Sequence, residues 1–197
     1  MSSPALHRSE SGAVANTGVT GEGTHRFTTG TKAVLALLRV ALGFTFLWAF
    51  LDKTFGLGYS TPSAKSWING GSPTKGFLSS VAVGPFESFF HSIAGTWWAN
   101  WLFMLGLLGI GVALILGVVM KISAWCATIM MAFMWAAEWP LAKFTSAGEA
   151  AGSTNPITDY HVIYALAALA LAFIGAGAYY GLGNWWSKVV GERTWLR

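Results

Sequence analysis

Charged residues and cysteine are both scarce in this chain. Only 10% of its 197 residues are charged, against roughly 25% in an average soluble domain, whereas 54% are hydrophobic. Cys126 is the one cysteine, which excludes an intramolecular disulfide, a CxxC redox pair and an iron–sulfur cluster. No cysteine–histidine group has the spacing of a zinc site, so we predict no bound zinc. With 11 tryptophans, this composition indicates a membrane protein.

The formal net charge of +4 does not indicate a nucleic-acid-binding protein. The basic residues form no continuous stripe, and they flank apolar segments instead. Flanking charge of this kind is typical of the topology signal in membrane proteins. We therefore expect the lipid bilayer, and no nucleic acid, as a partner.

Four apolar stretches are long enough to cross a bilayer. They cover residues 32–53, 97–119, 122–139 and 157–181, each near the ~20 residues that span ~30 Å of hydrocarbon. The sequence therefore predicts an all-α integral membrane protein, with a bundle of four transmembrane helices over residues 32–182. Asn155 is expected to cap the fourth helix, with Pro156 at its first position.

The two ends of the chain have a different composition. Residues 1–31 are rich in Ser, Gly and Thr and carry few apolar side chains, which predicts a disordered cytoplasmic tail. A signal peptide does not fit, because the apolar run after Lys32 has about 20 residues and no cleavage site of small residues follows it. Residues 183–197 are predicted to form a cytoplasmic C-terminal segment.

A long loop joins the first two predicted helices. Residues 63–80 are rich in turn-forming residues, and the aromatic stretch 83–95 is too short to span a membrane. A short surface-lying or re-entrant helix fits this stretch better. We expect the loop to cover the outer mouth of the bundle.

The distribution of lysine and arginine predicts the orientation. Seven of these residues fall on the side of the termini (Arg8, Arg26, Lys32, Lys121, Lys188, Arg193 and Arg197), and four fall on the other side (Lys53, Lys65, Lys75 and Lys143). Because positive charge is enriched in cytoplasmic loops, both termini are expected in the cytoplasm.

One arginine lies inside an apolar segment. Arg39 shares a helical face with Phe46, Phe50 and Lys53, since 100° per residue places them within about 40° of it. A charge at mid-membrane costs about 2.5–3.5 kcal/mol on insertion scales, so this face is expected to point into the bundle. A second interpretation is that the long side chain reaches the cytoplasmic headgroups.

Ionisable residues collect at the outer ends of three predicted helices. Asp52 and Lys53 close the first, Glu138 closes the third, and Asp159 and His161 open the fourth. Any one of them taken alone is explained as a solvated helix terminus, and Asp159 also suits a helix dipole. Their common depth nevertheless predicts one sheltered site beneath the long loop.

Three segments resemble the DoxX/DoxD family of small bacterial and archaeal membrane proteins. They are LLRVALGFTFLWAFLDKTFG, INGGSPTKGFL and NPITDYH, and the likeness extends over residues 32–182. DoxD members resemble the large subunit of a thiosulfate:quinone oxidoreductase, and other DoxX proteins are linked to membrane oxidoreductase assemblies. The resemblance implies a multi-pass protein of the bacterial inner membrane.

The resemblance implies a redox protein of this family, and we expect it to pass electrons from a small extracytoplasmic, thiosulfate-like anion to quinone as co-substrate. The predicted catalytic residues are His161, Asp159, Lys53 and Glu138, and the predicted substrate- and quinone-binding residues are Arg39, Phe46, Phe50, Asp52, Lys75 and Trp135. Histidine and aspartate would move protons, the basic residues would attract the anion, and the aromatic rings would hold the quinone. Glu138 would hold Lys53 or Lys143 in place.

A non-catalytic alternative is a scaffold or accessory subunit of a larger respiratory assembly, with a partner subunit or a second copy of the chain as partner. Haem is not expected, because only His91 and His161 are within reach of the membrane and both fall at its outer edge.

Overall fold

The computed structural model describes residues 27–196, and all regular structure in this part of the chain is helical. The four longest helices are α1 (Thr29–Phe55), α4 (Trp97–Leu116), α5 (Met120–Glu138) and α6 (Tyr160–Phe173). Three short α-helices accompany them, α2 (Lys75–Ser79), α3 (Glu87–Ile93) and α7 (Gly183–Val190), with 3-10 turns at Ser63–Lys65, Trp67–Asn69, Ala176–Ala178 and Thr194–Leu196.

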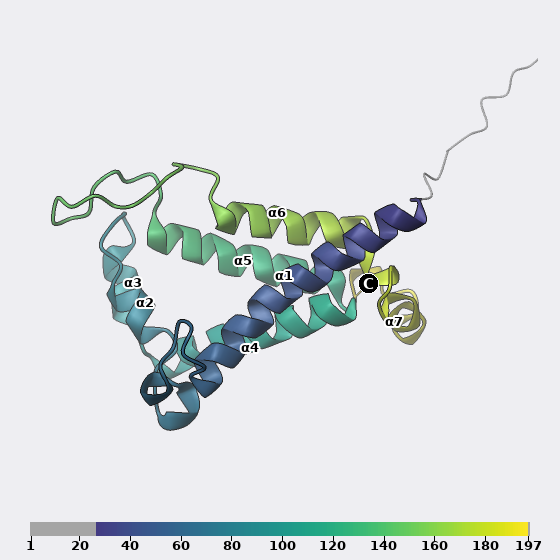
Figure 1. Cartoon of the computed structure of the whole chain (residues 1–197), viewed down its shortest axis with the longest axis horizontal. Coiled ribbons are helices and arrows are strands. Elements are labelled where there is room, and N and C mark those ends of the chain that lie inside the picture. Colours follow the sequence, from purple (N-terminus) through teal and green to yellow (C-terminus); the bar gives the residue numbers. More distant parts are fainter. Residues whose placement is uncertain (1–26, 197) are drawn as a thin grey trace, which may run out of the picture.

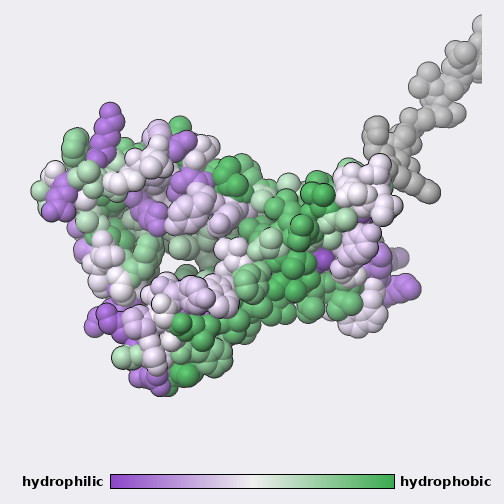
Figure 2. Space-filling view, in the orientation of Figure 1, coloured by the Kyte–Doolittle hydropathy of each residue, from purple (hydrophilic) through white to green (hydrophobic). Residues whose placement is uncertain are grey.

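Helices α1, α4 and α5 are long and apolar enough to cross a membrane, with 27, 20 and 19 residues. Only 28–33% of the residues in these spans are buried inside the protein, and hydrophobic side chains cover the middle of the face in Figure 2, with hydrophilic ones at its two ends. Such an apolar exterior matches a lipid solvent. The prediction of an all-α membrane protein is therefore confirmed.

The fourth predicted stretch differs from its helix. Helix α6 has 14 residues and ends at Phe173, whereas the apolar stretch continues to residue 181. Gly175 adopts a left-handed conformation (φ 72°), and the chain then turns through the 3-10 segment Ala176–Ala178. Glycine adopts this conformation without strain, so the helix stops while the composition remains apolar.

The four long helices form two packed pairs. Helix α1 packs mainly on α4, and α5 packs mainly on α6, with fewer contacts between the pairs. Figure 1 shows the pairs close together where α1 begins and farther apart toward α2 and α3. We call the end that carries residues 56–96 and 139–159 the loop end, and the end with the start of α1, the α4–α5 turn and α7 the terminal end (Figure 1).

The start of α6 is set by Asp159 and not by the predicted Asn155–Pro156 cap. The Asp159 carboxylate accepts hydrogen bonds from the backbone amides of His161 and Val162, at 3.0 and 3.2 Å. Asn155 instead accepts from the amides of Ile157 and Thr158, both at 2.9 Å. Asparagine and aspartate both satisfy free amides, and here each closes its own turn.

The long loop packs against the end of α5. Helix α3 occupies residues 87–93 of the aromatic stretch, and its Phe90 is buried against Val81 and Ala137. With 7 residues it lies across the loop end and does not span the membrane.

Helix α1 begins at Thr29, three residues before the predicted helix start at residue 32. The Thr28 hydroxyl accepts a hydrogen bond from the amide of Thr31 and caps the helix. The rest of the predicted tail, residues 1–26, lies outside the described residues.

Candidate functional site

Two pockets lie at the loop end, and the side chain of Phe77 lines both of them. The carboxylate pocket, of about 390 Å³, contains Glu138, Asp159 and Tyr160. The lysine pocket, of about 590 Å³, contains Lys53, Lys65 and Lys75. The predicted single site is therefore divided into an acidic and a basic half.

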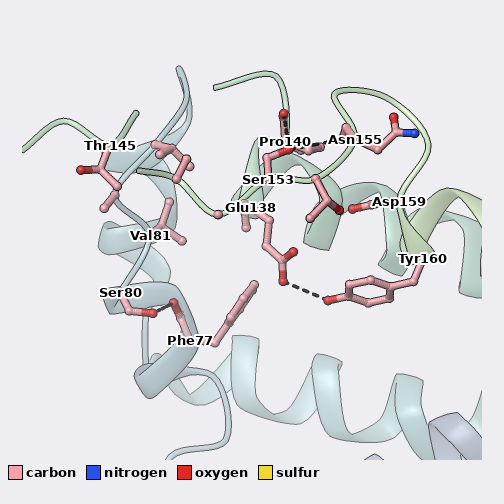
Figure 3. Close-up of a pocket in the computed structure, with 16 residues that line it drawn as sticks. Phe77, Ser80, Val81, Glu138, Pro140, Thr145, Ser153, Asn155, Asp159 and Tyr160 are labelled. Carbon is pink, nitrogen blue, oxygen red and sulfur yellow. Dashed lines mark hydrogen bonds between the residues drawn. The ribbon is translucent and has the colours of Figure 1, made fainter. Parts of the chain in front are cut away.

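The carboxylate pocket is built where α5 ends and α6 begins. Figure 3 shows the Glu138 carboxylate and the Tyr160 hydroxyl pointing toward each other, with Phe77 opposite. The Tyr160 hydroxyl donates to Glu138 Oε1 at 3.0 Å. The prediction that Glu138 would pair with Lys53 or Lys143 is wrong, because Glu138 accepts from Tyr160 and the one ion pair in residues 27–196 joins Asp159 and His161.

Asp159 and His161 form the second part of this site. His161 Nδ1 lies 2.8 Å from Asp159 Oδ2, and the imidazole is fully buried, with 0% of its surface exposed. The Tyr160 ring packs on the imidazole, with 3.9 Å between ring centroids. His161 Nε2 has no hydrogen-bond partner among the described residues. Leaving a buried polar atom unpaired costs about 1–3 kcal/mol, which makes this nitrogen a candidate ligand-binding atom, although His161 itself lines neither pocket.

The same residues carry side chains of the types that bind metal ions. Single ligand atoms of Glu138, Asp159 and His161 all lie within 4.8 Å of one another. However, both Asp159 oxygens already accept hydrogen bonds, from the α6 amides and from the His161 side chain. Hydrogen bonding alone therefore accounts for the close approach of these groups.

The lysine pocket collects three lysines from three elements. Lys53 lies in the last turn of α1, Lys65 in the first 3-10 turn and Lys75 at the start of α2. The Lys53 side chain is half-buried, with its Nζ 6.0 Å from the centre of the Phe103 ring. The pocket lining includes no aspartate or glutamate.

Asp52, next to Lys53, binds the loop that follows α1 and does not line the pocket. Its carboxylate is 1% exposed and accepts hydrogen bonds from the amides of Tyr59 and Ser60 and from the Ser60 hydroxyl, at 3.2, 3.1 and 2.7 Å. A carboxylate with three donors is well satisfied without a cation. Asp52 thus fixes the turn that follows α1, and Ser60 of that turn lines the lysine pocket.

Arg39 lies at the terminal end, about 14 residues or ~21 Å along the helix from Lys53. Its guanidinium is 0% exposed, with Nη1 donating to the carbonyls of Leu114 and Ile115 at 2.7 and 2.9 Å. Nη2 donates to the carbonyls of Tyr179 and Tyr180 at 3.3 and 3.4 Å. The interpretation that it reaches the headgroups is wrong, and Arg39 does not lie with the other predicted site residues.

The predicted aromatic residues are also dispersed. Phe46 is buried in the core, Phe50 packs beside it, and the Trp135 indole nitrogen donates to the carbonyl of Ile157 at 3.1 Å. Within the described residues, none of the three lines either pocket.

Asn100 has a supporting role that the sequence reasoning missed. It is the only strongly polar residue of α4, and that isolation within an apolar helix is a signal that could have drawn attention to it. Its Oδ1 accepts hydrogen bonds from the Thr74 hydroxyl, the Thr74 amide and the Ser72 hydroxyl, at 2.7, 3.1 and 3.1 Å. Asn100 therefore holds the lysine-pocket loop on α4. Tyr160 was missed as well, although it stands between two predicted site residues.

Replacing Asn100 with alanine is expected to destabilise the loop end by about 1–3 kcal/mol, because three buried donors would lose their acceptor. Thermal unfolding followed by tryptophan fluorescence measures this loss. The control is Thr45→Ala, which removes a hydroxyl from the exposed face of α1, away from the loop end. An unfolding temperature equal to that of the control would show that the contacts carry no stability.

Comparison with known families gives one match. The model of the DoxX family matches residues 34–139, more than half of the chain. The matched segment runs from α1 to the end of α5 and includes the three pocket lysines and Glu138, whereas Asp159 and His161 follow it. No curated protein and no solved structure matches the chain.

Proposed function

Given that this chain belongs to the DoxX family, we propose that it is a membrane redox protein that passes electrons from a small anion, thiosulfate-like, to a quinone. The observation that carries the proposal is the buried His161, which is oriented by Asp159 and has an unpaired Nε2. A quinone carbonyl accepts a hydrogen bond, and because Nδ1–H donates to Asp159, Nε2 donates one when the imidazole is protonated on both nitrogens.

Proton supply is the task that this site suits. Reduction of a quinone to a quinol consumes two electrons and two protons, and histidine titrates near neutral pH. Asp159 holds the imidazole through Nδ1, which leaves Nε2 for the proton that goes to the quinone oxygen. Glu138 and Tyr160 line the carboxylate pocket beside the start of α6. Water in this pocket can return a proton to the imidazole after each transfer.

The electron balance is met by two donor anions per quinone. If the donor is thiosulfate, two dianions each lose one electron and join through one new S–S bond, and the quinone takes both electrons. No thiol of the protein is needed for this step, in keeping with the single cysteine on the exposed surface of α5.

We further propose that α6 makes a fourth crossing and that the loop end is extracytoplasmic in a bacterial inner membrane, with both termini in the cytoplasm. At 14 residues α6 is about 21 Å long, short of ~30 Å of hydrocarbon. The apolar residues that follow to Ala178 extend its reach, and local thinning of the bilayer accommodates a short span.

The experiment is a turnover assay on the purified full chain in detergent or nanodiscs. A soluble quinone analogue is added with thiosulfate, and quinol formation is followed by absorbance. We expect quinol formation that depends on both protein and thiosulfate. If the correctly folded protein gives no quinol with thiosulfate, the proposed reaction is excluded.

The accessory-subunit alternative is supported by the order of the C-terminal segment. Lys121 Nζ donates to the carbonyl of Thr194 at 2.9 Å, and the Trp186 indole donates to Leu196 at 2.6 Å. These contacts hold the 3-10 turn Thr194–Leu196 against the start of α5 and against α7, and Trp185 and Trp195 are exposed, a surface that suits a partner. In cells, loss of function on deleting residues 183–197, without loss in His161→Gln, would favour this alternative.

A further inference from the structure

We infer that the lysine pocket is a binding site for a small oxoanion of charge −2, with Lys65 as a ligand beside Lys53 and Lys75. As the donor site of the reaction it rests on the proposed function, although the binding itself does not depend on turnover. The three lysines line one pocket, and the lining contains no aspartate or glutamate.

The three lysines are unpaired. Within residues 27–196 none of their ammonium groups has a hydrogen bond or an ion pair, and the Lys53 ammonium lies over the face of Phe103. Asp52, the nearest carboxylate in sequence, is occupied by the turn at Tyr59 and Ser60. Three like charges around one pocket repel one another, and an anion between them relieves that repulsion.

The loop that forms the pocket is held in place by close packing and hydrogen bonds. A Cβ atom at Gly71 would overlap the carbonyl oxygen of Lys65, and the Gly71 amide donates to the carbonyl of Ser66 at 2.9 Å. The hydrogen bond from the Thr74 hydroxyl to Asn100 fixes one edge of the loop, and the hydrogen bond from the Ser60 hydroxyl to Asp52 fixes the other. A rigid loop reduces the entropy that binding must overcome.

The pocket selects by charge more than by shape. The hydroxyls of Ser60 and Ser72 already donate, to Asp52 and to Asn100, so the ammonium groups are the strong donors left. Ammonium groups on flexible stems act as point charges and impose little geometry. A dianion is therefore preferred over chloride, and sulfate and thiosulfate are expected to compete for the same site.

The test is calorimetric titration of sodium sulfate and sodium thiosulfate into the full chain in nanodiscs, in a chloride buffer. We expect saturable binding of both anions that weakens as sodium chloride is raised. Lys53→Met should weaken binding about tenfold, because the residue is half-buried, and Lys65→Met or Lys75→Met about two- to fivefold.

One control removes a lysine outside the pocket, and a second keeps the charge within it. Lys143→Met, in the other exposed segment of the loop end and outside the pocket, should leave the affinity unchanged. Lys53→Arg keeps the charge and should retain most of the binding, which separates loss of charge from misfolding. Absence of saturable binding, or equal weakening by Lys143→Met, would overturn the inference. Anion binding without quinol formation would instead uphold this site and exclude the proposed reaction.

Discussion

Replacing Arg39 with alanine is expected to lower the stability of the protein by about 3–5 kcal/mol, because buried acceptors lose their donor and a large buried side chain is removed. Four carbonyl groups, of Leu114, Ile115, Tyr179 and Tyr180, would lose a charged donor inside the protein. Two of these carbonyls belong to the last turn of α4, where the Leu114 carbonyl also accepts from the Gly117 amide at 3.2 Å. The measurement is thermal unfolding in detergent, with the yield of folded protein as a second readout.

Arg39→Lys should recover only part of this loss. One ammonium cannot reach α4 and the turn after α6 together, whereas the planar guanidinium donates to both. Gly117→Ala tests the same contact from the other side, since its Cβ would lie 2.5 Å from Arg39 Nη1 and its φ is +74°.

The control is Leu38→Ala, on the exposed face of the same turn of α1. If Arg39→Ala unfolds at the temperature of this control and loses quinone reduction instead, Arg39 binds a ligand, as its sequence position first suggested. If Arg39 has a structural role, Arg39→Ala unfolds at a lower temperature than the control.

Replacing His161 with glutamine is expected to reduce the rate of quinone reduction about 10²- to 10⁴-fold, the range of a lost general acid. Glutamine keeps a polar side chain in the buried position but cannot carry a proton between Asp159 and a ligand. Asp159→Asn should cost about 10–100-fold, because the amide keeps the oxygen that caps α6 and loses the charge that orients the imidazole. The readout is kcat for quinol formation at saturating anion.

His91→Gln is the matched control for this experiment. His91 also lies at the loop end, on α3, and lines neither pocket, although its Nε2 contacts the carbonyl of Val81 at 2.8 Å and Val81 lines the carboxylate pocket. It should turn over like the unmodified protein. Full activity in His161→Gln would exclude His161 as the proton donor, whatever the activity of His91→Gln.

Local features of the sequence predicted much of the fold. Apolar length identified α1, α4 and α5, because a helix must satisfy its own backbone within the membrane and needs ~20 residues to cross it. The fourth stretch was predicted too long, since apolar composition continues past Gly175, where the backbone turns. The Asp159–His161 pair was also predictable in part, because an aspartate two residues before a histidine can cap the helix and contact the ring.

What the sequence could not supply was the set of distant partners. Arg39 binds carbonyls 75 to 141 residues away, and backbone acceptors carry no signature in the sequence. Lys53 and Glu138 end helices at the same end of the bundle, yet they line different pockets because the two helix pairs diverge there. Membrane insertion was therefore determined by the sequence alone, through the length and hydrophobicity of each segment. The separation of an acidic from a basic pocket was decided only by tertiary packing, because the angle between packed helices depends on contacts between residues far apart in the chain.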